Sequence, residues 1–308
     1  METLTPIIST QGLTKTYSGV ERVSDVSLNI YKGEIYGLIG KNGAGKTTLL
    51  RLILGVAAPT RGSVAINGNG SASALAEGRR KIGALIEQPA YYRTLNGFRN
   101  LKAYALALGC YDAQKVKDLL LFVGLEPNDK KPVKNYSLGM RQRLSIAMAL
   151  LNDPEVLILD EPLNGLDPTG IIQMREQIRF LNEKKGVTVI ISSHLLGELG
   201  KVATAYGIMR EGKMVKEVRG EELASLSRPH IRAVVADLPR ATQLLAAKFA
   251  PEDYSIRPDG AIEIYRNTDD LVGATEIFVS AGIPVLQLSV GQNDTEEAFV
   301  ALMQEERK

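Results

Sequence analysis

The apolar positions along this chain follow two patterns, which predict two kinds of strand. Between residues 7 and 30, apolar and polar residues alternate, as in Val26, Leu28 and Ile30, and this predicts strands with one buried face. Four later runs are apolar throughout, which is typical of central parallel strands that are covered on both faces. They span residues 35–39, 82–86, 156–159 and 187–191, with helical spacing between them at 48–54, 100–124 and 141–150. The order predicts an α/β fold.

The pattern changes after residue 220. Strand, helix, hairpin, helix and strand are predicted in the order βαββαβ, followed by a last helix, which predicts a small ferredoxin-like α+β domain. They span residues 231–235, 241–249, 254–265, 269–281, 285–288 and 295–306. We therefore expect two domains, 1–220 and 221–308. The second has no catalytic cluster and is expected to be a packing or dimerising appendage, in which His230 lacks a partner.

Charge separates the same two parts of the chain. Residues 221–308 hold 8 Lys and Arg against 15 Asp and Glu, a balance of −7. The whole chain has 37 Lys and Arg and 35 Asp and Glu. The remainder therefore has 37 − 8 = 29 basic and 35 − 15 = 20 acidic residues, a balance of +9. A basic first part suits an anionic nucleotide or the anionic inner leaflet of a membrane. It shows no basic cluster interleaved with aromatic residues, so nucleic acid is not an expected partner.

The composition of the chain is that of a soluble protein in a reducing compartment. Of 308 residues, 44% are hydrophobic and 23% are charged, as in a soluble globular protein. No apolar run reaches the roughly 18 residues that a membrane-spanning helix needs, and the N-terminus lacks the features of a signal peptide. The single cysteine, Cys110, excludes an intramolecular disulfide and suits a reducing cytosol.

One glycine-rich stretch carries the strongest chemical signal. It reads Gly40-Lys41-Asn42-Gly43-Ala44-Gly45-Lys46-Thr47, and it lies between a predicted buried strand and a predicted helix. The glycines let backbone N–H groups converge on phosphate oxygens, and the helix N-terminus adds a positive dipole. Lys46 can then reach the β- and γ-phosphates, while Thr47 can offer its hydroxyl to Mg²⁺. A glycine-rich turn can also do no more than connect two elements. The strand predicted before this loop and the helix predicted after it favour nucleotide binding.

Two further strands end in candidate catalytic residues. Asp160 and Glu161 follow the run at 156–159, and His194 follows the run at 187–191. An Asp at such a position can hold Mg²⁺, and an adjacent Glu can orient or deprotonate water. Alone, an acidic pair is more often a helix cap or a solvated loop, and a lone His is more often structural. Beside a phosphate loop the functional reading is favoured.

Taken together, residues 7–220 resemble the nucleotide-binding subunit of an ATP-binding-cassette (ABC) transporter. The motifs occur in the family's order: phosphate loop, glutamine loop, signature at Ser137–Gly139, Asp160-Glu161, the Asp167 loop and His194. The resemblance implies a P-loop NTPase fold with an N-terminal antiparallel β-subdomain and a helical subdomain at about 90–150. It also implies that two copies dimerise head to tail around two ATP molecules, hydrolyse them and drive a separate membrane permease.

The resemblance assigns roles to individual residues. Glu161 would activate water, His194 would act as the switch histidine, and Lys46 and Glu87 would complete the catalytic set. Mg²⁺ would be held by Thr47, Asp160 and either Glu87 or Gln88. The residues expected to contact ATP are Tyr17, Gly40, Asn42, Gly43, Ala44, Gly45, Lys46, Thr47, Thr48, Ser137, Gly139 and Asp167. The second copy of the chain would supply Ser137 and Gly139.

Two departures from the family pattern affect these roles. The signature, usually Leu-Ser-Gly-Gly-Gln, reads Tyr136-Ser137-Leu138-Gly139-Met140, which keeps the serine and the second glycine. At the glutamine loop, alignment on Ile82-Gly83 puts Glu87 at the usual glutamine position, and a carboxylate cannot donate hydrogen bonds as an amide does.

These variants look most like the subgroup that serves bacitracin, lantibiotic and related multidrug exporters. The subunit would then be cytoplasmic and held on the inner face of the membrane by its permease. The alternatives are a cassette ATPase that moves no solute, or an interaction protein that only senses ATP.

Overall fold

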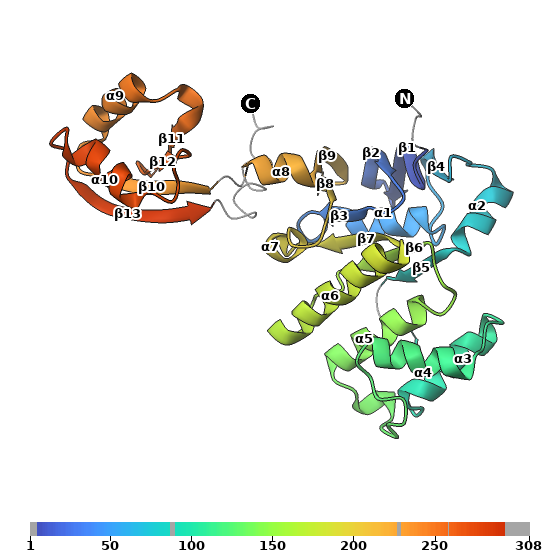
Figure 1. Ribbon diagram of the computed structural model, residues 1–308. Coiled ribbons are helices and arrows are strands. Elements are labelled where there is room, and N and C mark those ends of the chain that lie inside the picture. The colour runs from blue at the N-terminus through green and yellow to red at the C-terminus, as the bar shows by residue number, and fades with distance from the viewer. Residues whose placement is uncertain (1–4, 87–89, 227–228, 258, 293–308) are drawn as a thin grey trace. The chain divides into compact units, whose positions relative to one another are not determined.

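The computed structural model describes residues 5–86, 90–226, 229–257 and 259–292 (Figure 1). The chain divides into two compact units, Met1–Gly220 and Glu221–Lys308. Glu87, Gln88 and the helix predicted at 295–306 lie outside the described residues.

The smaller sheet of the first unit has three antiparallel strands in the order β2-β1-β4. β1 and β2 form a hairpin whose turn residues, Ser18 and Gly19, have φ angles of 48° and 81°. Positive φ at both positions is typical of a type I′ turn, whose twist matches that of the paired strands. The strands predicted from the alternating pattern at 7–30 are confirmed, as Ile8–Tyr17 (β1) and Val20–Ile30 (β2). Arg61–Ile66 (β4) completes the sheet.

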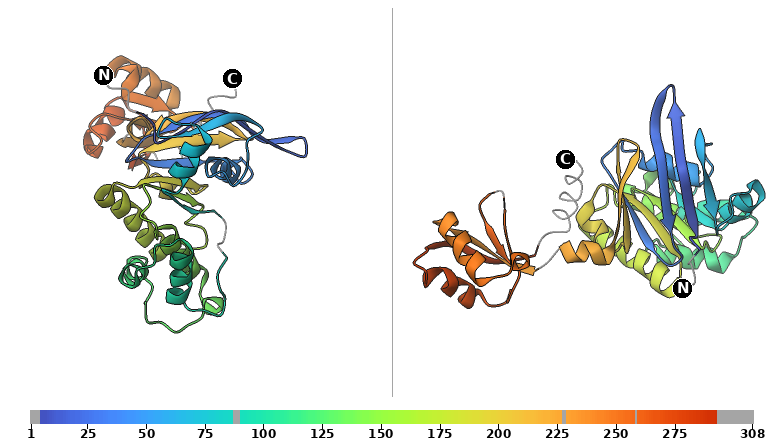
Figure 2. Two further views of the ribbon diagram at one scale, coloured as in Figure 1. Left: turned by 90° about the vertical axis from the view of Figure 1, so that its right-hand side faces the viewer. Right: turned by 90° about the horizontal axis from the view of Figure 1, so that it is seen from above.

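The larger sheet has six strands in the order β5-β6-β7-β3-β8-β9. Figure 2 shows the chain from two further sides. All pairs in this sheet are parallel except β8 with β9. The four apolar runs are all strands here, as predicted, and β3 and β7 are buried along their whole length. Since β6, β7 and β3 are parallel neighbours, the loops after them leave from one edge of the sheet. The strands span Ile35–Ile39 (β3), Ile82–Leu85 (β5), Val156–Asp160 (β6), Thr188–Ser193 (β7), Ala205–Arg210 (β8) and Lys213–Arg219 (β9).

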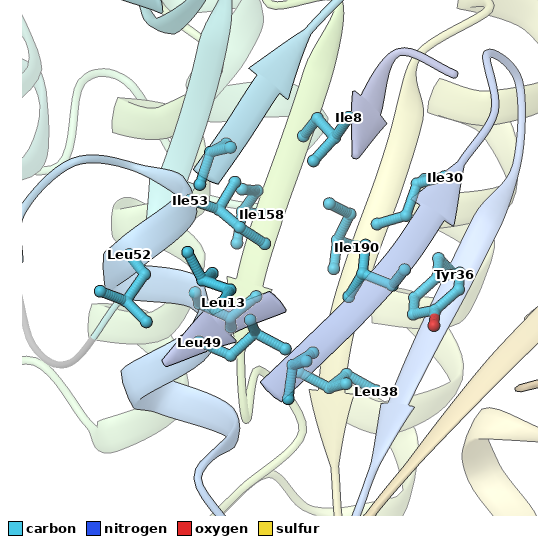
Figure 3. Packing of buried hydrophobic residues seen from close by; sticks show 14 of the residues in the cluster. Ile8, Leu13, Ile30, Tyr36, Leu38, Leu49, Leu52, Ile53, Ile158 and Ile190 are labelled. Carbon is cyan, nitrogen blue, oxygen red and sulfur yellow. The ribbon is translucent and has the colours of Figure 1, made fainter. Parts of the chain in front are cut away.

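One apolar cluster joins both sheets to helix α1 (Lys46–Ile53) (Figure 3). Leu49 of α1 is fully buried and shares this cluster with Ile8 of β1, Ile158 of β6 and Ile190 of β7. Truncating one such buried leucine to alanine costs about 2–5 kcal/mol. The cluster therefore fixes α1, and with it the loop that precedes α1.

Helices α3, α4 and α5 form a group below the larger sheet in Figure 1. The prediction of one helix over 100–124 is wrong, because the chain leaves the helical conformation after Ala107 and re-enters it at Ala113. Gly109 has φ of 71°, and the Asp112 carboxylate accepts hydrogen bonds from the backbone of Gln114 and Lys115, which starts a new helix. The first unit's other helical segments are Ala72–Arg79 (α2), Gly97–Ala107 (α3), Ala113–Phe122 (α4), Val133–Asn135 (η1), Leu138–Ala149 (α5), Pro168–Lys185 (α6) and Leu196–Leu199 (α7), and α8 (Gly220–Leu226) follows.

The second unit contains a four-stranded antiparallel sheet in the order β11-β12-β10-β13, which packs with helices α9 and α10. Ile231 of β10, Ile264 of β12, Leu245 of α9 and Phe278 of α10 are all buried in one cluster. The predicted strands and helices up to β13 are confirmed. They span Pro229–Val235 (β10), Leu238–Lys248 (α9), Pro251–Asp253 (η2), Tyr254–Ile256 (β11), Ile262–Ile264 (β12), Leu271–Val279 (α10) and Val285–Gln292 (β13).

A polar cluster is buried in this second unit. Glu263 has only 2% of its surface exposed and accepts hydrogen bonds from Arg257 Nε at 2.6 Å and Tyr265 Oη at 2.9 Å. His230 Nε2 lies 3.6 Å from Glu263 Oε1, so the prediction that His230 lacks a partner is wrong. Burial on its own raises the pKa of Glu263, but the hydrogen bonds from Arg257 and Tyr265, with the charge of His230, bring that pKa below its ordinary value.

Candidate nucleotide site

The glycine-rich loop connects β3 to α1, and its backbone is one that only glycine accommodates easily. Gly43 and Gly45 have φ angles of 84° and 104°. A Cβ on Gly45 would lie 2.5 Å from the carbonyl oxygen of Arg22, and a Cβ on Gly40 would lie 2.6 Å from that of Met209. The loop therefore needs glycine at these positions both for its conformation and for its close packing. Its outer face at Gly43 is open, since a Cβ there would meet nothing within 4 Å.

Lys46 is held at the centre of the loop. Its side chain is nearly buried, at 6% exposed, and its ammonium group donates a hydrogen bond of 2.6 Å to the carbonyl of Gly40. The same nitrogen lies 3.1 Å from Glu161 Oε1. A hollow of about 230 Å³ opens beside it, lined by Arg22, Asn42, Gly43, Ala44, Gly45, Lys46, Thr47, Thr48 and Glu161. A buried cation beside a glycine-rich backbone at a helix N-terminus makes this hollow suited to an anion.

Asp160 ends β6 against the first turn of α1. Its Oδ2 accepts a hydrogen bond of 2.7 Å from the Thr47 hydroxyl, and its Oδ1 accepts one of 2.5 Å from the hydroxyl of Ser192 on β7. Ser192 was not among the predicted site residues. A serine near the carboxyl end of a buried parallel strand, next to the strand that carries Asp160, was the available signal. Thr47 and Asp160 together present the hydroxyl and carboxylate oxygens that Mg²⁺ prefers.

Glu161 lies between the loop and His194. Its φ of 50° is unusual for a residue other than glycine, and its backbone N–H donates to Ser192 Oγ at 2.9 Å. Its Oε1 contacts Lys46 and its Oε2 is 2.9 Å from His194 Nδ1. Strained backbone of this kind costs about 1–3 kcal/mol and is concentrated at functional sites. Glu161 is also one of the residues that line the hollow.

The signature residues and Asp167 form a second cluster, apart from the hollow's lining. Ser137 caps α5 by accepting a hydrogen bond of 3.2 Å from the backbone of Met140, and Asp167 caps α6 through Gly170. Gly139 lies against Leu166, because a Cβ added to it would be 3.4 Å from Leu166 Cδ2. Within one chain, the structure brings the signature and the Asp167 loop together but does not bring either to Lys46.

Tyr17 lies at the tip of the β1–β2 hairpin with 42% of its surface exposed. The ammonium of Lys15 is 4.8 Å from the centre of its ring, and Tyr17 is not part of the hollow's lining. Beyond Glu87 and Gln88, which lie outside the described residues, the chain is anchored by Tyr91, whose hydroxyl donates to the carbonyl of Arg141 at 2.8 Å. Burial raises the pKa of the Tyr91 hydroxyl, which keeps that anchor neutral.

The sequence is similar to those of known transport ATP-binding proteins. The family model described as "ABC transporter" matches residues 23–164. The bacitracin transport ATP-binding protein BcrA of Bacillus licheniformis is 38% identical over 300 residues, covering 97% of this chain and 98% of that protein. The lantibiotic transport ATP-binding protein SrtF of Streptococcus pyogenes is 42% identical over 218 residues, covering 70% of this chain and 93% of that protein. The resemblance drawn from the motifs is confirmed.

Solved structures match the same part of the chain. A dimeric, post-hydrolysis structure of the ATP-binding cassette MJ0796 bound to ADP and Pi has a TM-score of 0.64 and 25% identity, covering 69% of this chain and 98% of that one. The structure of cbiO1 from Clostridium perfringens, part of the ABC transporter complex cbiONQ, has a TM-score of 0.63 and 25% identity. The match covers 71% of this chain and 91% of that one. No helix among the described residues is long and apolar enough to cross a membrane. The chain belongs to the ATP-binding proteins of ABC transporters, which hydrolyse ATP to power transport.

Proposed function

We propose that the hollow beside Lys46 holds the phosphates of ATP. Lys46 would contact the β- and γ-phosphates, while the backbone of Gly43–Thr48 and the side chain of Asn42 would surround them. Tyr17 would stack on the adenine, since its ring is exposed at a hairpin tip. Thr47 and Asp160 would hold Mg²⁺, which neutralises phosphate charge when bound. Ser192 would position Asp160, because its hydroxyl donates to the oxygen that faces away from Thr47.

Glu161 would act as the general base. Its carboxylate reaches the hollow and is fixed from both sides, by Lys46 at 3.1 Å and by His194 at 2.9 Å. This arrangement is the observation that carries the catalytic proposal. When γ-phosphate attracts Lys46, the Lys46–Glu161 contact weakens and the carboxylate becomes free to take a proton from water. His194 would hold the other oxygen and so orient the base.

A complete site would need two copies of the chain. Ser137 and Gly139 lie at the start of α5 with Asp167 nearby, and the lining around Lys46 includes none of them. A head-to-tail dimer would place one copy's signature over ATP held by the other. The dimeric state of the MJ0796 cassette supports this arrangement. The isolated subunit is then expected to bind ATP yet hydrolyse it slowly.

The transported compound would be a peptide antibiotic or a drug. Two relatives that align with most of the chain are named for bacitracin and lantibiotic transport. The subunit would be cytoplasmic and attached to the inner face of the membrane by a separate permease, as cbiO1 is part of a larger transporter complex. Co-expression with a candidate membrane permease, followed by measurement of bacitracin resistance, tests this part of the proposal.

The two units would have different tasks. Residues 1–220 would form the ATPase domain, with the helical subdomain at about 90–150, and residues 221–308 an accessory domain. The second unit's order β11-β12-β10-β13, with a helix before β11 and another before β13, supports a ferredoxin-like fold. Its buried Glu263 is fully engaged by neighbours, which suits a structural role.

The catalytic proposal is tested by Glu161→Gln. This variant should bind ATP, measured with a fluorescent ATP analogue, but should lose hydrolysis, measured by phosphate release. An unchanged rate would show that Glu161 is not the base. For the glutamine loop, Glu87→Ala should lower the rate more than Gln88→Ala, and the opposite order would refute the proposed register.

A further inference from the structure

The sheet of the second unit has two very different edges. One edge is β11, which is only three residues long, and the other is β13, which is eight residues long. Within the described part of the chain, β13 pairs on one side only, with β10. An edge strand presents a row of unpaired N–H and C=O groups that can pair with another strand.

β13 lacks most of the features that usually protect an edge. Its sequence, Val-Leu-Gln-Leu-Ser-Val-Gly-Gln, contains no charged residue and no proline, although residues 221–308 carry a net charge of −7. Leu286 and Val290 are 67% and 55% exposed. A register irregularity near Leu286 interrupts the start of the strand, but residues 287–292 continue in regular register with β10. As far as the described residues show, the unprotected stretch is therefore 287–291.

We propose that β13 pairs antiparallel with β13 of a second copy of this chain, with Ser289 of each copy facing the other across a two-fold axis. In this register Leu288 lies opposite Val290 of the partner subunit, and Gln287 lies opposite Gly291 of the partner subunit. Apolar side chains then meet on the face that α9 and α10 cover, where Leu288 packs against the core. The strand is self-complementary, as a two-fold interface requires.

The strand's own sequence favours a second copy as the occupant, because the two-fold register pairs Leu288 of each copy with Val290 of the partner subunit. The net charge of −7 on each domain opposes their approach, but β13 itself adds no like charge at the contact. The opposite edge is short and is followed by Arg257, which is engaged with Glu263. The inference deepens the proposed function, because it gives two cassettes a contact that does not depend on ATP.

The first experiment measures the mass of the full-length chain by light scattering without nucleotide. The wild type should dimerise. Ser289→Asp and Ser289→Lys each place like charges opposite each other, and each should raise the dimer dissociation constant by at least about tenfold. A mixture of the two variants should dimerise again, because the opposite charges then face each other. Ile256→Asp, on the β11 edge, is the matched control and should leave the dimer intact.

A cross-link tests the register directly. Residues that face each other in antiparallel strands have Cα atoms about 4.5–5.5 Å apart, within disulfide range. In a chain with Cys110→Ser, Ser289→Cys should form a disulfide dimer under mild oxidation without ATP, and Ile256→Cys should not. A monomeric wild type would overturn the proposal, as would a dimer that Ser289→Asp leaves unchanged, or one lost only when residues 293–308 are removed. ATP hydrolysis is read separately, so failure here leaves the role of Glu161 standing.

Discussion

The chain has two histidines, and each lies against a glutamate. In the first unit, His194 is 2.9 Å from Glu161, with side chains 38% and 20% exposed. In the second, His230 is 3.6 Å from Glu263, with side chains 5% and 2% exposed. The same pair of residue types therefore occurs once at an open edge and once in a closed interior.

The difference lies in what else each carboxylate contacts. Glu263 is surrounded by Arg257, Tyr265 and His230, all of which favour its charged form. Glu161 has Lys46 and His194 at its sides and faces a hollow. A carboxylate whose partners are complete stabilises a fold, whereas one that can exchange a partner for a ligand can take part in chemistry. The comparison predicts opposite results for matched substitutions.

Glu161→Gln should give the largest effect. Loss of a general base lowers turnover by about 10²–10⁴-fold. The melting temperature should change less than in Glu263→Gln, because the Glu161 side chain is 20% exposed and Lys46 keeps its hydrogen bond to the carbonyl of Gly40. Phosphate release and thermal melting, measured on the same preparation, check both halves of the prediction. Equal turnover in variant and wild type would remove the distinction between the two pairs.

Glu263→Gln should show the reverse. It leaves Arg257 and His230 without their buried counter-charge and should lower the free energy of unfolding of the second unit by about 3 kcal/mol. ATP turnover at temperatures well below the melting point should stay within about twofold of the wild type. Glu252, an exposed residue nearby, gives the control Glu252→Gln, which should change neither quantity. Denaturant unfolding measures the loss, and an effect on turnover comparable to that of Glu161→Gln would contradict the structural role.

Ser192→Ala should have an intermediate effect on turnover. Ser192 donates to Asp160 and accepts from the backbone of Glu161, so its loss leaves both site residues less well held. A buried hydrogen bond of this kind is worth about 1–3 kcal/mol, which corresponds to roughly 5- to 150-fold in rate. Ser193→Ala is the adjacent control, because Ser193 Oγ contacts only the backbone of Leu195 among the described residues. Equal effects of the two changes would argue against a positioning role for Ser192.

The smallest predicted effect is a pH dependence of stability. Glu263 has a pKa in the folded state below its ordinary value of 4.5. Its ionised form is thus favoured by folding, so its contribution is present above about pH 4.5 and is lost as pH falls through the lowered value. The difference in unfolding free energy between wild type and Glu263→Gln should therefore shrink as the pH is lowered from about 5.5 to about 3. A difference that grows on acidification would show the opposite sign of shift.

The sequence predicted the strands and the loop better than the contacts between them. The buried strands and the Lys46 loop followed from apolar runs and glycine spacing, because both are local. The break between α3 and α4 was missed, since apolar spacing continues across Gly109 while its left-handed backbone interrupts the helix. Ser192 and the partner of His230 were missed because each depends on a strand that is distant in sequence. Strand order decides such contacts, and periodicity alone does not give it.

The central claim is that one active site draws on two copies of the chain. Lys46→Ala removes the phosphate-binding cation, and Ser137→Ala removes the signature hydroxyl, so each variant alone should hydrolyse ATP slowly. When the two are mixed, a mixed dimer contains one site with both Lys46 and Ser137 intact. Phosphate release by the mixture should then clearly exceed the sum of the separate rates, approaching about a quarter of the wild-type rate if half of the dimers are mixed and the sites act independently. A mixture that only matches that sum, or a Ser137→Ala variant with full activity on its own, would contradict the shared site.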